Sequence, residues 1–75
     1  MENVIEFKNL VVGAIIEHNG IIAEIDETNM ENENEIIIFF YADKESYKNR
    51  DYVEQISLNK KGIYQNTIDY IEEMF

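Results

Sequence analysis

The sequence predicts a small α+β domain, with an antiparallel sheet or SH3-like barrel of about four to five strands and a C-terminal helix. Three observations support this prediction: two β-branched runs around an Asn-Gly pair, an apolar run over residues 36–42, and helical spacing near the C-terminal end. With 75 residues the chain is expected to form one domain, residues 1–75, because so short a chain builds a single core.

The first predicted element is a β-hairpin. Residues 12–17 and 21–26 are rich in β-branched side chains, and Asn19-Gly20 between them supplies the positive φ angles that a tight turn requires. With a two-residue turn, one face carries Ala14, Ile16, His18, Ile21, Ala23 and Ile25, and the other carries Ile15, Glu17, Ile22, Glu24 and Asp26. A three-residue loop with a glycine bulge would shift one strand by a residue, so the register stays open.

Two more strands are expected after the hairpin. Residues 27–35 are polar and predict an exposed loop, and residues 35–42 predict a third strand. This strand is apolar on both faces, so we expect it to be central or to have a covered face. Residues 43–51 read as a charged connection and 52–58 as a fourth strand, and residues 4–7 are a candidate for a further short strand.

The C-terminal segment predicts a helix. Tyr64, Ile68, Ile71 and Phe75 recur at helical spacing. Asn66 or Thr67 is the expected N-cap, which would place Asp69 favourably for the helix dipole. A helix of about ten residues is not stable alone in water. We therefore expect its apolar stripe to pack on the sheet.

The hairpin segment from Val12 to Ile25 also resembles the opening hairpin of SH3-like barrels. In that family a glycine often follows an apolar pair and precedes a strand, an Asn-Gly turn and a second strand. Here Val12 and Gly13 precede Ala14-Ile15-Ile16, and Asn19-Gly20 leads into Ile21-Ile22. The resemblance implies a fold and no activity.

Composition bears on where the protein acts. Sixteen Asp and Glu against six Lys and Arg give a net charge of -10, which repels nucleic-acid phosphates and anionic membranes. The first residues lack a basic segment and a continuous apolar stretch, so a cytosolic protein is expected. An Ile- and Asn-rich, Ala-poor composition is typical of AT-rich coding and favours a bacterial or phage source.

The sequence predicts no enzyme, no cofactor and no metal site. The chain has no cysteine and one histidine, His18, which we interpret as a surface residue beside a turn. Its Ser and Thr residues do not lie in a nucleophile-elbow or phosphate-loop pattern. The acidic segment 26–33 lacks the sixth-position glycine of an EF-hand loop.

The distribution of charge is the main functional signal. No Lys or Arg lies between Lys8 and Lys44, an interval rich in carboxylates. A segregated acidic surface of this kind fits the basic groove of a nucleic-acid-binding protein. The candidate partner-binding residues are Glu24, Asp26, Glu27, Glu31, Glu33 and Glu35, with Glu72 and Glu73 as a second cluster.

In size, charge and α+β pattern the chain is similar to small acidic inhibitor proteins of phages and mobile elements, including anti-CRISPR proteins and DNA mimics. This resemblance implies a non-catalytic protein that inhibits a basic partner, such as a phage-defence nuclease, and that does not itself bind nucleic acid. The alternative is a self-associating structural or accessory domain. Its basis is the apolar strand from Ile36 to Tyr41, which is expected to complete a sheet across a homodimer.

Overall fold

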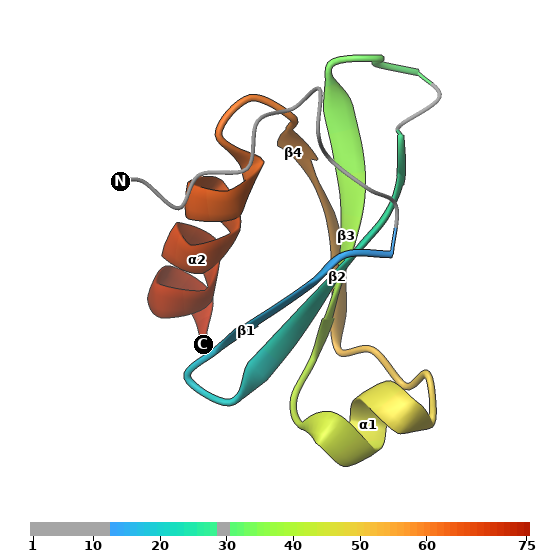
Figure 1. Ribbon diagram of the computed structural model, residues 1–75, viewed down its shortest axis with the longest axis vertical. Helices are drawn as coiled ribbons and strands as arrows, with labels where there is room; N and C mark the ends of the chain where they lie inside the picture. The colour runs from blue at the N-terminus through green and yellow to red at the C-terminus, as the bar shows by residue number, and fades with distance from the viewer. Residues whose placement is uncertain (1–12, 29–30) are drawn as a thin grey trace.

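The computed structural model describes residues 13–28 and 31–75, which form a four-stranded antiparallel sheet with a helix against one face (Figure 1). The predicted α+β class is confirmed. The elements are β1 (Ile15–His18), β2 (Ile21–Thr28), β3 (Glu35–Tyr41), α1 (Lys44–Lys48), β4 (Glu54–Asn59) and α2 (Ile63–Met74). The strand predicted at residues 4–7 lies outside the described residues.

The hairpin has the two-residue turn. Asn19 and Gly20 have φ angles of 53° and 83°, and the register places His18 opposite Ile21. Side chains that lie directly opposite each other in an antiparallel pair share a face. The predicted division of the hairpin into two faces is therefore confirmed, and the three-residue loop is wrong.

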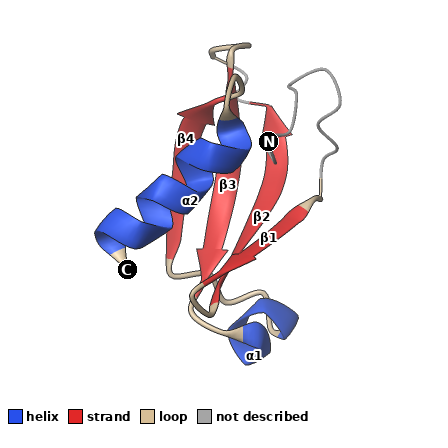
Figure 2. Cartoon of the chain, turned by 60° about the vertical axis from the view of Figure 1, so that its left-hand side comes forward, coloured by secondary structure: helices blue, strands red, loops and turns tan. Residues whose placement is uncertain are grey.

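The sheet is open within the described residues. Its strand order is β1-β2-β3-β4, so β1 and β4 form opposite edges and the described strands do not close into a barrel. Figure 2 shows α2 lying across one face of the sheet and α1 beyond one end of the strands. The other face of the sheet, opposite α2, is called the open face below.

Strand β3 is central, as its two apolar faces predict. It pairs with β2 along one edge and with β4 along the other. Ile36, Ile38 and Phe40 are buried on the α2 side, while Ile37 and Phe39 are half-buried on the open face. Because both edges are paired, the segment from Ile36 to Tyr41 has no edge left with which to complete a second sheet.

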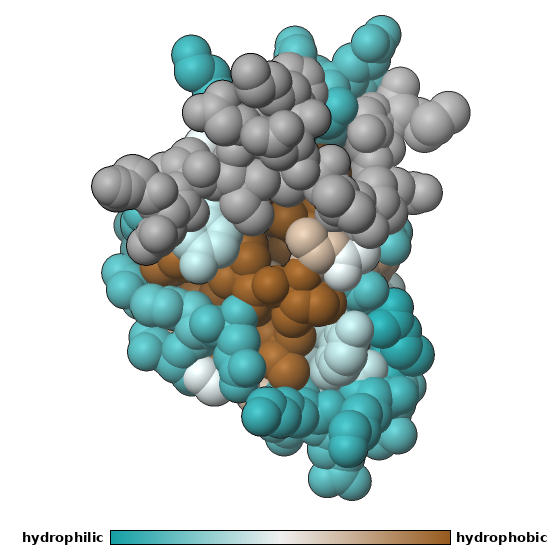
Figure 3. Space-filling view, viewed as in Figure 1, coloured by the Kyte–Doolittle hydropathy of each residue, from teal (hydrophilic) through white to brown (hydrophobic). Residues whose placement is uncertain are grey.

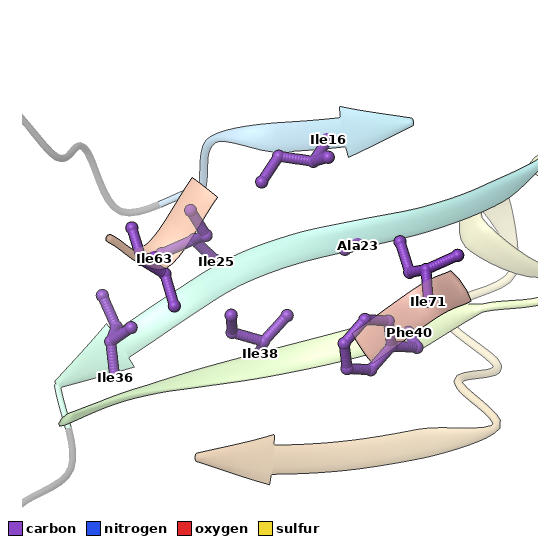
Figure 4. Packing of buried hydrophobic residues seen from close by; sticks show 8 residues of the cluster. All are labelled: Ile16, Ala23, Ile25, Ile36, Ile38, Phe40, Ile63 and Ile71. Atoms are coloured by element: carbon purple, nitrogen blue, oxygen red, sulfur yellow. The ribbon is translucent and has the colours of Figure 1, made fainter. Parts of the chain in front are cut away.

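The core lies between the sheet and α2. Figure 3 shows hydrophobic residues gathered between α2 and the strands, and Figure 4 shows the buried cluster from close by. Its members are Ile16, Ala23, Ile25, Ile36, Ile38, Phe40, Ile63 and Ile71. Each fully buried isoleucine contributes roughly 1.5–3 kcal/mol relative to an exposed one, so this cluster is the main stabilising feature of the fold.

Helix α2 begins earlier than predicted. It starts at Ile63 after Gly62, a residue with a φ of 71°, so the expected N-cap at Asn66 or Thr67 is wrong. Thr67 lies one turn into the helix and is fully buried between Ile63 and Ile71. Asp69 consequently lies in the middle of the helix, away from the positive end of its dipole.

The connection predicted at residues 43–51 contains the short helix α1. The carboxylate of Asp43 caps this helix by accepting a 2.7 Å hydrogen bond from the backbone N–H of Ser46. That hydrogen bond lowers the pKa of Asp43, because it favours the charged carboxylate. Strand β4 then begins at Glu54, two residues later than expected.

The side chain of Thr67 offers a test of this packing. Its hydroxyl oxygen is buried and has no hydrogen-bond partner among the described residues. A Thr67→Val variant removes the unsatisfied group but keeps the branched shape, so we expect the free energy of unfolding to rise by about 1 kcal/mol. Urea denaturation measures this change in the free energy of unfolding. Thr67→Ser, which keeps the hydroxyl and loses the methyl, should destabilise the fold, and loss of stability in Thr67→Val would contradict this packing.

Candidate binding surface

The open face combines apolar and acidic side chains. The register places Ile15, Glu24, Phe39 and Gln55 in one row across the four strands. The described side chains that the register places on this face are Ile15, Glu17, Ile22, Glu24, Glu35, Ile37, Phe39, Tyr41, Gln55, Ser57 and Asn59. Apolar groups beside polar ones are also the composition of protein–protein interfaces.

Glu24 is the best-buried carboxylate on this face. The residue is 9% exposed, and its Oε1 atom accepts hydrogen bonds from the Tyr41 hydroxyl at 3.2 Å and from Arg50 Nη2 at 2.8 Å. A buried carboxylate needs such partners because desolvation otherwise disfavours its charge. Glu24 was predicted to contact a partner, but its charge is already balanced by Arg50, so we leave it out of the proposed contact surface.

Arg50 also attaches α1 to the sheet. Its guanidinium carbon lies 5.8 Å from the ring centre of Tyr41 and 5.3 Å from that of Tyr47. The two tyrosine rings pack edge to face with centroids 5.2 Å apart. Arg50 has a φ of 58°, a conformation that non-glycine residues adopt at a cost. These contacts hold a helix that buries none of its own residues.

A second aromatic pair lies further along the open face. The rings of Phe39 and Tyr52 pack edge to face with centroids 4.8 Å apart. Tyr52, which precedes β4, is 47% exposed, and Ile15, in the same row as Phe39, is 45% exposed. Apolar groups of this kind supply contact area at a protein interface.

The other residues of the first predicted cluster lie along β2 and at the β2–β3 turn. Asp26 is the extra residue of a β-bulge and is half-buried, because Ile25 pairs with Ile38 while Glu27 pairs with Ile37. The side chain of Glu27 is outside the described part of the structure. Glu31 and Glu33 are exposed in the turn, and Glu35 is half-buried at the start of β3.

The second predicted cluster lies in the other layer. Glu72 and Glu73 are exposed in the last turn of α2, where no basic residue is present. The Oε2 atom of Glu72 is 2.9 Å from Nε2 of His18, so this end of the helix contacts the β1–β2 turn. Because α2 covers the face opposite the open one, a flat partner surface cannot contact both predicted clusters together.

The structure adds Glu17 to the first cluster. This residue was not predicted as a contact, but it is exposed and the register places it on the open face, opposite Ile22. Its alternation with Ile16 along β1 was the available signal. We define the acidic strand surface as Glu17, Asp26, Glu31, Glu33 and Glu35.

The described residues contain neither a metal-binding cluster nor a membrane-spanning helix. Among residues 13–28 and 31–75, no group of three His, Asp or Glu side chains is arranged to hold a metal ion. No helix in this part of the chain is long and apolar enough to cross a membrane. Comparison with known proteins finds no matching family model, no similar curated protein and no similar solved structure.

Two tyrosines predict how stability depends on alkaline pH. Burial raises the pKa of Tyr41, with a further contribution from Glu24, and the 2.6 Å hydrogen bond to Glu54 raises the pKa of Tyr70. The folded state therefore keeps protons that the unfolded state loses near pH 10. We expect the free energy of unfolding to fall as pH rises above about 10, with a shallower fall in Tyr41→Phe and Tyr70→Phe.

Denaturant titrations between neutral and alkaline pH measure this dependence. Tyr52→Phe, at an exposed tyrosine, is the control for removing a tyrosine hydroxyl. At neutral pH, Tyr41→Phe should cost about 1 kcal/mol through the lost hydrogen bond to Glu24. Equal alkaline slopes in all three variants and the wild type would contradict the assignment.

The last turn of α2 gives a further prediction. Two carboxylates at the negative end of a helix dipole are unfavourable, and among the described residues it is Glu72 that contacts the other layer, through His18. Glu73→Lys should therefore raise the free energy of unfolding by about 0.5 kcal/mol. Glu73→Gln should give a smaller gain in the same thermal or urea measurement. A loss of stability in Glu73→Lys would show that Glu73 has a stabilising contact.

Proposed function

We propose that this protein is a non-catalytic acidic binding protein that inhibits a basic, nucleic-acid-binding partner by occupying the place where that partner holds phosphates. A phage-defence nuclease is the type of partner that fits best. The acidic strand surface makes the contact, and the half-exposed apolar groups of the open face add contact area.

One observation carries this proposal: the described cations all lie outside the three strands β1, β2 and β3. Lys44, Lys48 and Arg50 belong to α1 and the connection after it, and Lys60 and Lys61 to the β4–α2 turn. On the open face Arg50 balances Glu24, and the acidic strand surface gives β1, β2 and β3 a net negative field. Such a field steers a partner of opposite charge toward one side of the molecule.

The rigidity of the sheet also supports the proposal. Adjacent strands lie about 4.8 Å apart, so Glu17, Asp26 and Glu35 are held at fixed spacings on β1, β2 and β3, and Glu31 and Glu33 lie in the turn between β2 and β3. A DNA strand carries one phosphate per about 3.4 Å of helix axis, so this array is a sparser version of the same charge pattern. An Arg- and Lys-lined groove would bind it without the cost of ordering a flexible acidic segment.

A competition assay tests the proposal. Purified nucleases and other DNA-binding enzymes are each bound to a fluorescent DNA duplex, and the protein is added at increasing concentration. We expect stoichiometric displacement of DNA from at least one enzyme, more strongly at low salt because the contact is electrostatic. Failure to displace DNA from any enzyme at low salt would contradict the proposal.

Matched charge variants locate the contact. Glu17→Gln, Glu31→Gln and Glu33→Gln together should weaken displacement about tenfold or more, the equivalent of about 1.4 kcal/mol. A control with Glu45→Gln, Asp51→Asn and Asp69→Asn changes the net charge by the same amount at exposed positions elsewhere. Equal weakening by both triple variants would show that total charge, and not the acidic strand surface, drives binding.

A further inference from the structure

The outer edge of β4 has features of a pairing site. Within residues 13–28 and 31–75, β4 has a strand neighbour on one side alone, β3. The backbone N–H of Lys60 donates to the carbonyl of Asn34. Backbone direction alternates along a strand, so the N–H and C=O groups of Leu58, Ile56 and Glu54 also point toward β3. The backbone groups of Gln55 and Asn59 accordingly point away from the sheet.

This edge lacks the usual protection against pairing. Natural edge strands carry charged side chains, proline or a bulge, which prevent contact with another strand. Residues 55–59 contain no charged residue, although the chain has a net charge of -10, and the chain has no proline. The register between β3 and β4 is regular along its whole length. Among the described residues, the uncharged stretch 55–59 is a place where a second copy meets little electrostatic repulsion.

The sequence of β4 is complementary to itself in an antiparallel register. With a two-fold axis at residue 57, Glu54 lies opposite Lys60 of a second copy and Ile56 lies opposite Leu58. Gln55 then lies opposite Asn59, so outward-pointing backbone groups meet outward-pointing ones. Acidic groups meet basic groups, apolar groups meet apolar groups, and amides meet amides.

Neighbouring registers lose this match. Outward-pointing residues must stay opposite outward-pointing residues, so the second strand can slide only in steps of two residues. Each such step moves the two-fold axis by one residue. With the axis at residue 56, Glu54 would lie opposite the apolar Leu58. With the axis at residue 58, Lys60 would lie opposite the apolar Ile56. Charge and hydrophobicity together therefore select the axis at residue 57.

We propose that two copies of this chain dimerise through antiparallel pairing of their β4 edges, with the two-fold axis at residue 57. The two four-stranded sheets become one continuous sheet. Opposite residues in an antiparallel pair share a face, so both α2 helices lie on one side and both open faces on the other. This proposal is independent of the proposed function, since it uses a different edge and a different partner.

The dimer is expected to be weak and to depend on salt. One strand from each copy gives an interface at the small end of the range for specific contacts. Each copy carries a charge of -10, so long-range repulsion opposes association, and added salt screens that repulsion more than the short Glu54–Lys60 contacts. Moderate salt should therefore strengthen the dimer.

Analytical ultracentrifugation over a wide concentration range tests the association. We expect a reversible monomer–dimer equilibrium that Gln55→Pro abolishes, because proline removes an outward N–H and leaves the β3 pairing intact. Gln55→Thr, which keeps the N–H, should dimerise. A strict monomer at all concentrations and salts, or a dimer unaffected by Gln55→Pro, would overturn the proposal.

Charge variants test the cross-pairs. Lys60→Glu should weaken dimerisation about tenfold, since two attractive pairs per dimer become repulsive. Adding Glu54→Lys should restore it, with circular dichroism to check that loss of the Tyr70 contact to Glu54 leaves the fold intact. No recovery in a folded double variant would overturn the register.

Single cysteines test the axis directly, because the chain has no cysteine of its own. In a Ser57→Cys variant the two sulfurs meet at the axis, where opposite Cα atoms lie about 5.5 Å apart, within disulfide range. Gln55→Cys places its two sulfurs several residues apart. Mild oxidation should cross-link Ser57→Cys and not Gln55→Cys, and equal cross-linking of both would overturn the proposal.

Discussion

The packing of α2 on one face of the sheet is the constraint on which the rest of the structure depends. One amphipathic helix covers one face, and Ile63, Thr67 and Ile71 fill that layer completely. Within residues 13–28 and 31–75 the other helix, α1, has five residues and lies beyond one end of the strands, so it does not cover the other face. Contacts between Glu24, Tyr41 and Arg50 stabilise that face instead, and Ile15 and Glu17 are exposed on it.

Much of this arrangement could be predicted from local patterns. Asn19-Gly20 determined the turn, and alternation assigned the paired residues 15–18 and 21–24 to their faces, whereas the bulge at Asp26 interrupts the alternation. The apolar segment 36–41 was predicted to be central because it carries apolar side chains on both faces. The start of α2 was not predictable in the same way. Thr67 resembles an N-cap in sequence, but packing between Ile63 and Ile71 makes it a core residue.

The candidate surface was predicted in part. Acidic residues in the β2–β3 turn are exposed because they lie in a turn, which sequence reveals. Whether Glu24 can contact a partner depends on Arg50, 26 positions away, and the sequence predicts only a charged connection over residues 43–51, where the structure has α1. Likewise, helical spacing predicts that Glu72 and Glu73 lie on a helix, but it does not predict that this helix lies in the layer opposite the other carboxylates. Long-range contacts decide which charges are available, and no local pattern contains them.

The central claim is that the acidic strand surface, and not total charge, makes this protein a ligand for basic partners. An NMR titration of the labelled protein with an oligo-arginine peptide tests it most directly. The account predicts that backbone shifts concentrate at Glu17, Asp26 and residues 31–35, and diminish with salt. Shifts spread equally over Glu45, Asp51 and Asp69 would contradict it.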